Sequence, residues 1–216
     1  MKLNMITIFY ILAGTINLIL TIVMIRQYLC SRSIYTIFSI LVFAALIYDN
    51  YVIALGKFIG EGDTLKILNT GRFYTHALFT SWIIVTSFGI LKRIGIGWAQ
   101  SKIVHSMFCI LALAMFCLGV YMDMWLLQLV PKQENETLRY VNDGFHGPPI
   151  PAIVTIVVLT FVGVIVWIKK KSPWTFLGAL LMFICAPLGI RFPIVGQFGE
   201  ICFGGALISG ENEAQK

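Results

Sequence analysis

The sequence predicts an all-α protein that lies in a membrane as a compact bundle of about seven transmembrane helices. Of its 216 residues, 58% are hydrophobic and only 12% are charged, and the mean hydropathy is +0.87. A soluble protein carries about 25% charged residues, because its surface faces water. The apolar excess runs along the whole chain, so we expect one transmembrane domain over residues 1–209 and a short polar tail over residues 210–216.

The individual spans follow from the length of the apolar runs, since a bilayer core about 30 Å thick needs around 20 mostly apolar residues per helix. The predicted spans are Met5–Ile25, Ile34–Leu55, Phe73–Leu91, Ile103–Met122, Ile150–Ile168, Thr175–Ile190 and Ile194–Ser209. The last two are short and flank a segment, residues 186–193, with two prolines and a glycine that favour a break. A re-entrant pair of helices is the alternative there.

Basic residues collect in alternate predicted loops, which indicates how the bundle is oriented. The first, third and fifth loops hold none of the acidic residues but contain Arg26, Arg32, Lys92, Arg93, Lys102, Lys169, Lys170 and Lys171. Lys and Arg mark the cytoplasmic side of a multi-pass cell-membrane protein. We therefore expect the amino terminus outside and the carboxyl terminus inside. The net charge of +6 is then mainly a signal for membrane insertion, and no nucleic-acid partner is expected.

Ionisable residues inside the predicted spans are the best pointers to function, because a charged side chain near the bilayer centre costs roughly 2.5–3.5 kcal/mol. Asp49 falls in the outer half of the second span and is followed by Asn50. Glu200 lies near the middle of the last span, among glycines that would let other helices approach closely. These glycines are Gly196, Gly199, Gly204 and Gly205.

Further charged residues are expected at the same, outer side of the membrane. Arg72 and His76 share a helix face because they are four residues apart, Asp123 closes the fourth span, and Arg191 lies in the break. With Asp49, Asn50 and Glu200, they predict a single polar cavity that opens outward. Two arginines leave one of the three acids unpaired unless the histidine is protonated, and such an acid can hold or deliver a proton near neutral pH. The alternative is a set of purely structural ion pairs and hydrogen bonds, with Asp49 bound to Arg72.

Two loops carry further expectations. In the second loop, Asp63 is predicted to cap a short helix whose apolar face lies on the membrane. The loop that ends at Pro149 is rich in turn residues and is expected to cover the cavity as a lid. No metal or other cofactor is expected, since no H-x-x-x-H motif is present and His105 falls on the other side of the membrane from His76 and His146.

The sequence leaves three kinds of function open. No P-loop, GxGxxG or GxSxG motif is present. The favoured hypothesis is a membrane enzyme that acts on a lipid or isoprenoid, because the polar groups gather at one depth on one side. Asp49 and Glu200 would be its general acid and base, while the binding residues would be Asn50, Arg72, His76, Asp123 and Arg191. The alternatives are a small proton-coupled transporter and a receptor or interaction protein with structural polar residues.

Overall fold

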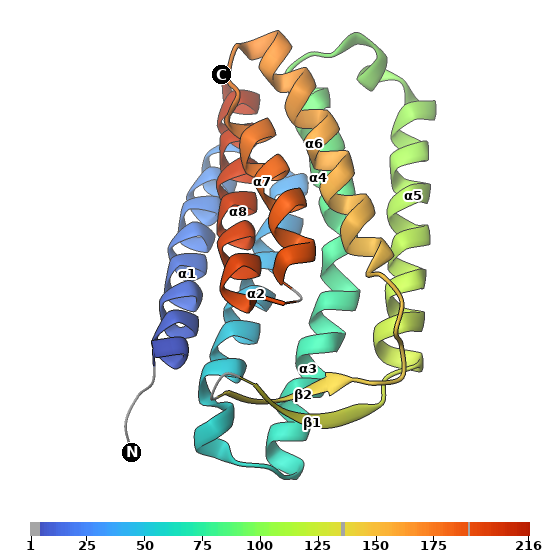
Figure 1. Ribbon diagram of the computed structural model, residues 1–216. Helices are drawn as coiled ribbons and strands as arrows, with labels where there is room; N and C mark the ends of the chain where they lie inside the picture. Colours follow the sequence, from blue (N-terminus) through green and yellow to red (C-terminus); the bar gives the residue numbers. More distant parts are fainter. Residues whose placement is uncertain (1–4, 135–136, 190) are drawn as a thin grey trace.

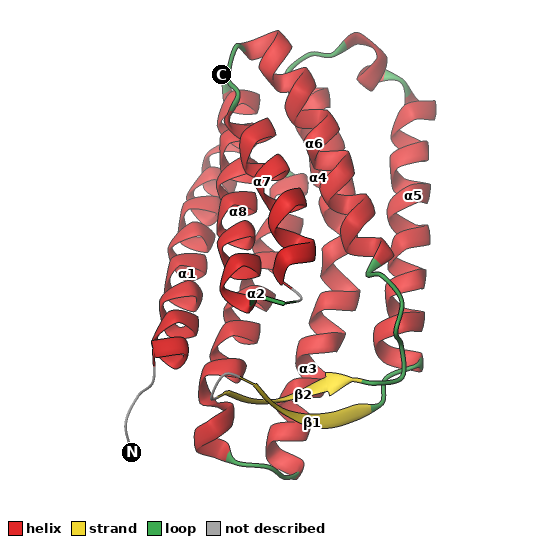
Figure 2. Ribbon diagram, viewed as in Figure 1, coloured by secondary structure: helices red, strands yellow, loops and turns green. Residues whose placement is uncertain are grey.

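The computed structural model describes residues 5–134, 137–189 and 191–216. The chain forms an upright bundle of helices with one two-stranded antiparallel sheet lying across its lower end (Figures 1 and 2). We call the end that carries the two strands the hairpin end and the other the opposite end. The described chain begins near the hairpin end, and its carboxyl terminus lies at the opposite end (Figure 1).

The elements follow one another along the chain with short connections. The helices are α1 (Met5–Ser31), α2 (Ile34–Ile59), α3 (Asp63–Phe79), α4 (Ile83–Arg93), α5 (Lys102–Val120), α6 (Ile150–Lys170), α7 (Trp174–Gly189) and α8 (Pro193–Gln215). A 3₁₀ turn, Thr80–Trp82, joins α3 to α4, and a π-helical turn, Tyr121–Trp125, extends α5. The strands are β1 (Leu129–Glu134) and β2 (Thr137–Asn142).

Among the described residues, five helical stretches are long and apolar enough to cross a membrane. They are Met5–Ser31, Ile34–Ile59, Asp63–Arg93, Lys102–Trp125 and Ile150–Lys170. These stretches contain the first five predicted spans, so the chain is a multi-pass helical membrane protein. The sixth predicted span corresponds to α7, which is apolar but only 16 residues long.

The short surface helix predicted at Asp63 is wrong. The helix that begins there runs without interruption through Phe79 and continues through the 3₁₀ turn into α4, so it is the first half of the third long stretch. Its polar residues are tolerated because they have partners inside the bundle. Asn69 is buried and donates to the carbonyl of Leu65, and Tyr48 of α2 donates to the carbonyl of Leu68.

The predicted break near the end of the chain separates α7 from α8. The two helices pack closely, since a Cβ atom on Gly199 would lie 2.7 Å from the Cβ of Cys185. Gly204 allows a similarly close approach of Leu20 and Phe43, whereas Gly205 faces open space. Figure 1 shows α7 ending and α8 beginning short of the hairpin.

Residues 210–215, expected as a free polar tail, are instead the last turns of α8. Glu211 is fully buried there, and Arg93 donates to both of its carboxylate oxygens at 2.6 and 2.8 Å. The hydroxyl of Thr36 donates a third bond at 3.0 Å. Gln27 of α1 donates to Asn212 at 2.8 Å. The end of the chain is helical because its polar groups are satisfied by α1, α2 and α4.

The main apolar core lies between α1, α2, α4, α6 and α8, where Met24, Phe43, Ile83, Leu159 and Leu207 are buried together. The hairpin is docked on the end of this bundle. Gly56 of α2 has no side chain where the carbonyl of Leu138 in β2 approaches it. The strands pair Lys132 with Arg139 and Glu134 with Thr137.

Candidate functional site

An ion pair joins α2 to α3 at the hairpin end. The Nε–H group of Arg72 donates to Asp49 Oδ1 at 2.7 Å, and Arg72 Nη1 donates to Asn69 Oδ1 at 2.6 Å. The side chains of Arg72 and Asp49 are 11% and 24% exposed. The pair is therefore mostly shielded and its charges largely cancel.

Glu200 of α8 lies near this pair but does not bond to it. The charge of Glu200 interacts with those of Asp49 and Arg72. Its Oε2 atom is buried and accepts no hydrogen bond from any residue in the described part of the chain. Tyr10 of α1 is buried within electrostatic range of Asp49, Arg72, Glu200 and Arg139. Four elements thus bring their charged groups around one tyrosine.

The hairpin adds a further arginine to this region. Arg139 of β2 donates to Glu134 of β1 at 3.1 Å, while Lys132 lies 3.2 Å from the same carboxylate. Burial raises the pKa of Glu134, but the hydrogen bonds and charges of Lys132 and Arg139 outweigh it and hold that pKa below its usual range. The Nε–H group of Arg139 is buried without an acceptor among the described residues.

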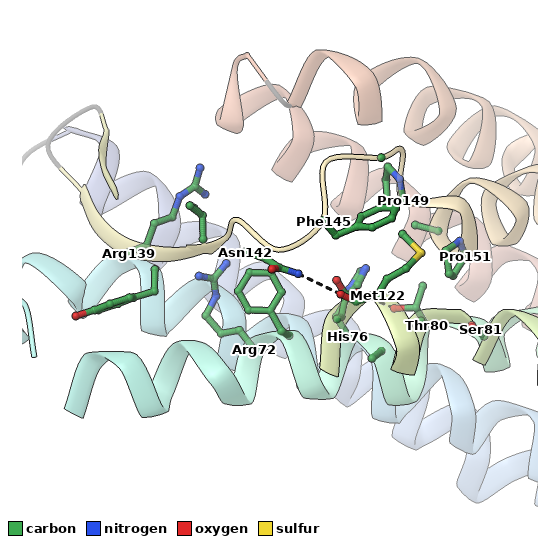
Figure 3. A pocket seen from close by; sticks show the side chains of 18 residues that line it. Arg72, His76, Thr80, Ser81, Met122, Arg139, Asn142, Phe145, Pro149 and Pro151 are labelled. Atoms are coloured by element: carbon green, nitrogen blue, oxygen red, sulfur yellow. Dashed lines mark hydrogen bonds between the residues drawn. The ribbon is translucent and has the colours of Figure 1, made fainter. Parts of the chain in front are cut away.

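A cavity of about 370 Å³ lies between α3, the π-helical turn, β2 and the start of α6. We call it the hairpin cavity. Figure 3 shows Arg72 and His76 of α3, Arg139 and Asn142 of β2, and Phe145 around it. Asn142 donates to the carbonyl of Met122 at 3.1 Å and so ties β2 to the π-helical turn. Apolar side chains complete the wall: Phe73, Ala77, Met122, Val141, Phe145, Pro149, Pro151 and Ala152.

His76 and Asp123 bring an imidazole and a carboxyl group to this wall. His76 is exposed and its Nδ1 atom lies 3.2 Å from the hydroxyl of Thr80. Asp123 belongs to the π-helical turn, and its charge interacts with that of His76. An imidazole and a carboxyl group from two different helices therefore face one cavity.

A second cavity, of about 350 Å³, lies between the start of α1, the hairpin and the start of α8. We call it the α1–α8 cavity. Its polar wall includes Tyr10, Glu134, Arg139 and Arg191, and its apolar wall includes Ile6 and Phe192. Arg139 lines both cavities, so the guanidinium group of the hairpin lies between them.

The structure brings the predicted site residues into three groups that adjoin one another. Arg72, His76 and Asp123 line the hairpin cavity, and Arg191 lines the α1–α8 cavity. Asp49 pairs with Arg72 and does not line either cavity in the described residues. The two remaining predicted residues, Asn50 of α2 and Glu200 of α8, each have a buried oxygen atom that accepts no hydrogen bond from the described residues, and they are also absent from both described cavity walls.

Sequence reasoning missed two residues that the structure places centrally, Arg139 and Tyr10. The run Thr137-Leu138-Arg139-Tyr140-Val141 has the alternation and residue types of a strand. That pattern would have predicted the hairpin and the side on which Arg139 projects. Tyr10 gives no such signal, because a tyrosine in an apolar run is most simply a packing residue.

A metal centre of the usual kind is not formed by the described residues. Within these ranges, no three His, Cys, Asp or Glu side chains are grouped to hold a metal ion. His105 lies near the start of α5, where its ring stacks on Phe88 at a centroid distance of 4.9 Å. His146 lies 3.7 Å from Asp143 on an exposed loop.

The fold and the site define a multi-pass helical membrane protein with two cavities, lined by charged and apolar residues, at one end of the bundle. Comparison with protein-family models, with curated proteins and with solved structures found no match for the chain.

Proposed function

We propose that this protein is an integral membrane enzyme that binds a lipid or another lipophilic molecule with an anionic head in the hairpin cavity. The observation that carries this proposal is the composition of the cavity wall. Arg72, Arg139 and His76 offer hydrogen-bond donors to an anionic group, and Phe73 and Phe145 belong to the apolar part of the wall. A pocket with a few convergent polar groups in an apolar lining is typical of a site for an amphiphile.

In this proposal the chemistry is acid–base catalysis by His76 and Asp123. Histidine is the side chain that most often acts as a general acid or base, and a neighbouring carboxylate stabilises its charged form. Asp49 and Glu200, which the sequence favoured for this role, do not line the described cavity walls. Asp49 instead positions Arg72 through their ion pair.

The orientation in the membrane belongs to the same proposal. The connections that follow α1, α4 and α6 lie at the opposite end (Figure 1). The residues in or next to these connections include Arg32, Lys102 and Lys171, and the positive-inside rule then puts the hairpin end outside the cell membrane. Green fluorescent protein fused after Lys216 should fluoresce, because it folds in the cytoplasm. A dark fusion that is nevertheless expressed would contradict this orientation.

The binding step is tested with purified protein and named lipids. Native mass spectrometry should show phosphatidic acid bound in preference to phosphatidylcholine, and Arg139→Gln should weaken that preference at least tenfold, since a charge-assisted hydrogen bond contributes about 1.5–3 kcal/mol. Lys132→Gln is the matched control, because Lys132 lies on the same hairpin, is half exposed and does not line the described cavity. Equal binding of both lipids would refute the assigned head group.

The catalytic step is tested in liposomes made from a total membrane lipid extract, with lipids followed by mass spectrometry. The wild type should change the abundance of at least one lipid class, and His76→Asn and Asp123→Asn should abolish that change. His146→Asn is the control, since His146 is exposed at the same end and does not line the described cavity. An unchanged lipid profile with intact phosphatidic acid binding would identify a lipid-binding protein instead of an enzyme.

A second candidate, an ion-coupled transporter, is favoured by one observation. Polar side chains continue from the hairpin end into the bundle between α1, α2 and α8, where Asn17 and Asn50 are fully buried. Buried polar residues in membrane helices often mark ion pathways. Uptake of an anionic substrate into liposomes under an imposed sodium or proton gradient would distinguish transport from catalysis.

A further inference from the structure

Four polar side chains in the contact between α1, α2 and α8 each have an oxygen atom without a hydrogen-bond donor. The atoms are Asn17 Oδ1, Asn50 Oδ1, Gln197 Oε1 and Glu200 Oε2, and none of the described residues donates to them. Asn17 and Asn50 are 0% exposed, and Gln197 is 7% exposed. The amide nitrogen of Asn17 has no partner in the described chain either.

Close contacts at two glycines show how the three helices are aligned. A Cβ atom on Gly14 of α1 would lie 3.4 Å from the Cβ of Asn50 in α2. A Cβ atom on Gly204 of α8 would lie 2.7 Å from Leu20 of α1 and 2.6 Å from Phe43 of α2. The helix α2 runs toward the hairpin end, whereas α1 and α8 run away from it (Figure 1). Asn50 therefore lies nearer the hairpin end than Phe43, just as Gly14 lies nearer that end than Leu20.

The four oxygen-bearing residues lie between these two contacts. Asn17 is three residues from Gly14 and three from Leu20. Glu200 and Gln197 precede Gly204 by four and seven residues, a spacing that keeps them on the same face of α8. At a rise of 1.5 Å per residue, the four positions fall within about 6 Å along the bundle axis.

No Lys or Arg of the described residues donates a hydrogen bond to these four oxygen atoms. The sequence of α8 contains no Lys or Arg. The charge of Arg72 interacts with that of Glu200, but Arg72 is already bonded to Asp49 and Asn69. A carboxylate and three amide carbonyls without donors in a low-dielectric interior are costly. A ligand that supplies positive charge and accepts oxygen ligands would remove that cost.

We propose that Asn17, Asn50, Gln197 and Glu200 form a binding site for a monovalent metal cation, with sodium as the natural probe. Carboxylate and carbonyl oxygens are the donors that hard cations prefer. The cluster contains a single carboxylate, so one positive charge neutralises it, whereas a divalent ion would leave a buried charge uncompensated. The site is independent of the acid–base chemistry proposed for the hairpin cavity, and a sodium-coupled transporter could use it.

The test measures the melting temperature of the purified protein in detergent, in sodium chloride and in choline chloride at equal ionic strength. Sodium should raise the melting temperature with a saturating dependence on concentration, by roughly 5–10 °C at 100 times the dissociation constant. Glu200→Gln and Asn17→Leu should lose this rise. Glu61→Gln, the same acid-to-amide change at an exposed loop position, should keep it.

A wild-type melting temperature that is identical in sodium and choline would overturn the proposal and would leave buried water as the partner of these oxygens. A sodium effect that survives in both Glu200→Gln and Asn17→Leu would overturn it too, because the ion would then bind elsewhere. If Glu200→Gln does not fold, binding of radioactive sodium to the wild type and to Asn17→Leu decides. One ion per wild-type chain and none in the variant supports the site, and any other result refutes it.

Discussion

Replacement of Glu211 by leucine should destabilise the protein far more than its place near the carboxyl terminus suggests. Glu211 is 0% exposed and accepts two hydrogen bonds from Arg93 and one from Thr36. Leucine has a similar volume but no acceptor, so the guanidinium group of Arg93 would remain in the bundle without its partner. Removal of one member of a buried ion pair costs about 3–5 kcal/mol.

The lower part of this range is expected here, because the Arg93 side chain is 20% exposed and keeps some access to water. About 3 kcal/mol corresponds to a fall of roughly 6–12 °C in melting temperature for a chain of this size. Glu213→Leu is the matched control, since Glu213 pairs with Lys216, whose side chain is 66% exposed. A pair of that kind contributes only about 0–1 kcal/mol.

The assay is reversible unfolding in detergent, with a double-mutant cycle between the two partners. Arg93→Met combined with Glu211→Leu should regain most of the lost stability, because an apolar pair can replace a buried ion pair at little cost. The interpretation that the Arg93–Glu211 pair stabilises the packing of α8 would be refuted by either of two results. One is a loss below about 1 kcal/mol in the free energy of unfolding for Glu211→Leu alone, and the other is no recovery in the double variant.

Three further predictions concern the hairpin end. Gly56→Ala should displace β2, because the added methyl group would meet a backbone carbonyl of that strand, and hydrogen exchange of the β2 amides should rise; Gly205→Ala, which meets nothing within 4 Å, should not have this effect. The lowered pKa of Glu134 means that its stabilising contribution is present above the unfolded-state pKa of about 4.3 and is lost as the pH falls through the lower folded-state value. The protection factors of the hairpin amides, which are corrected for the intrinsic exchange rate at each pH, should therefore fall below about pH 4, and this fall should disappear in Glu134→Gln. Asp49→Asn should cost about 1–3 kcal/mol by leaving Arg72 without its charged acceptor, and a loss below 0.5 kcal/mol in unfolding experiments would show that the pair is too exposed to matter.

The long apolar helices were predictable because hydropathy reports directly what a bilayer requires. The start of the third span was not, because polar residues lower the hydropathy of α3 before Phe73. In the structure those residues have specific partners. Asn69 and Arg72 bond to each other, and Arg72 bonds to Asp49. A hydropathy window counts such residues as unfavourable, since it cannot see which side chain will satisfy them.

The extent of α8 could have been predicted from spacing instead of hydropathy. The positions 200, 204, 207 and 211 follow one helix face, and the last three are fully or almost fully buried. That periodicity continues into the residues interpreted as a polar tail. The partner of Glu211 could not be predicted in the same way, because Arg93 is 118 residues away in the chain and the contact depends on how the helices pack.

The contrast between two acids on α8 gives the last prediction. Glu200 and Glu211 lie on one face of the same helix, but Glu211 is surrounded by donors while the Oε2 atom of Glu200 has none among the described residues. Replacement of each acid by leucine should therefore affect the free energy of unfolding differently in sodium-free choline buffer. Glu211→Leu removes a satisfied charge and destabilises, whereas Glu200→Leu removes an unsatisfied acceptor, which leaves stability unchanged or higher. Similar losses of melting temperature in both variants would show that groups of the protein itself stabilise the Glu200 carboxylate. Neither a bound cation nor a proton would then be needed to explain its burial.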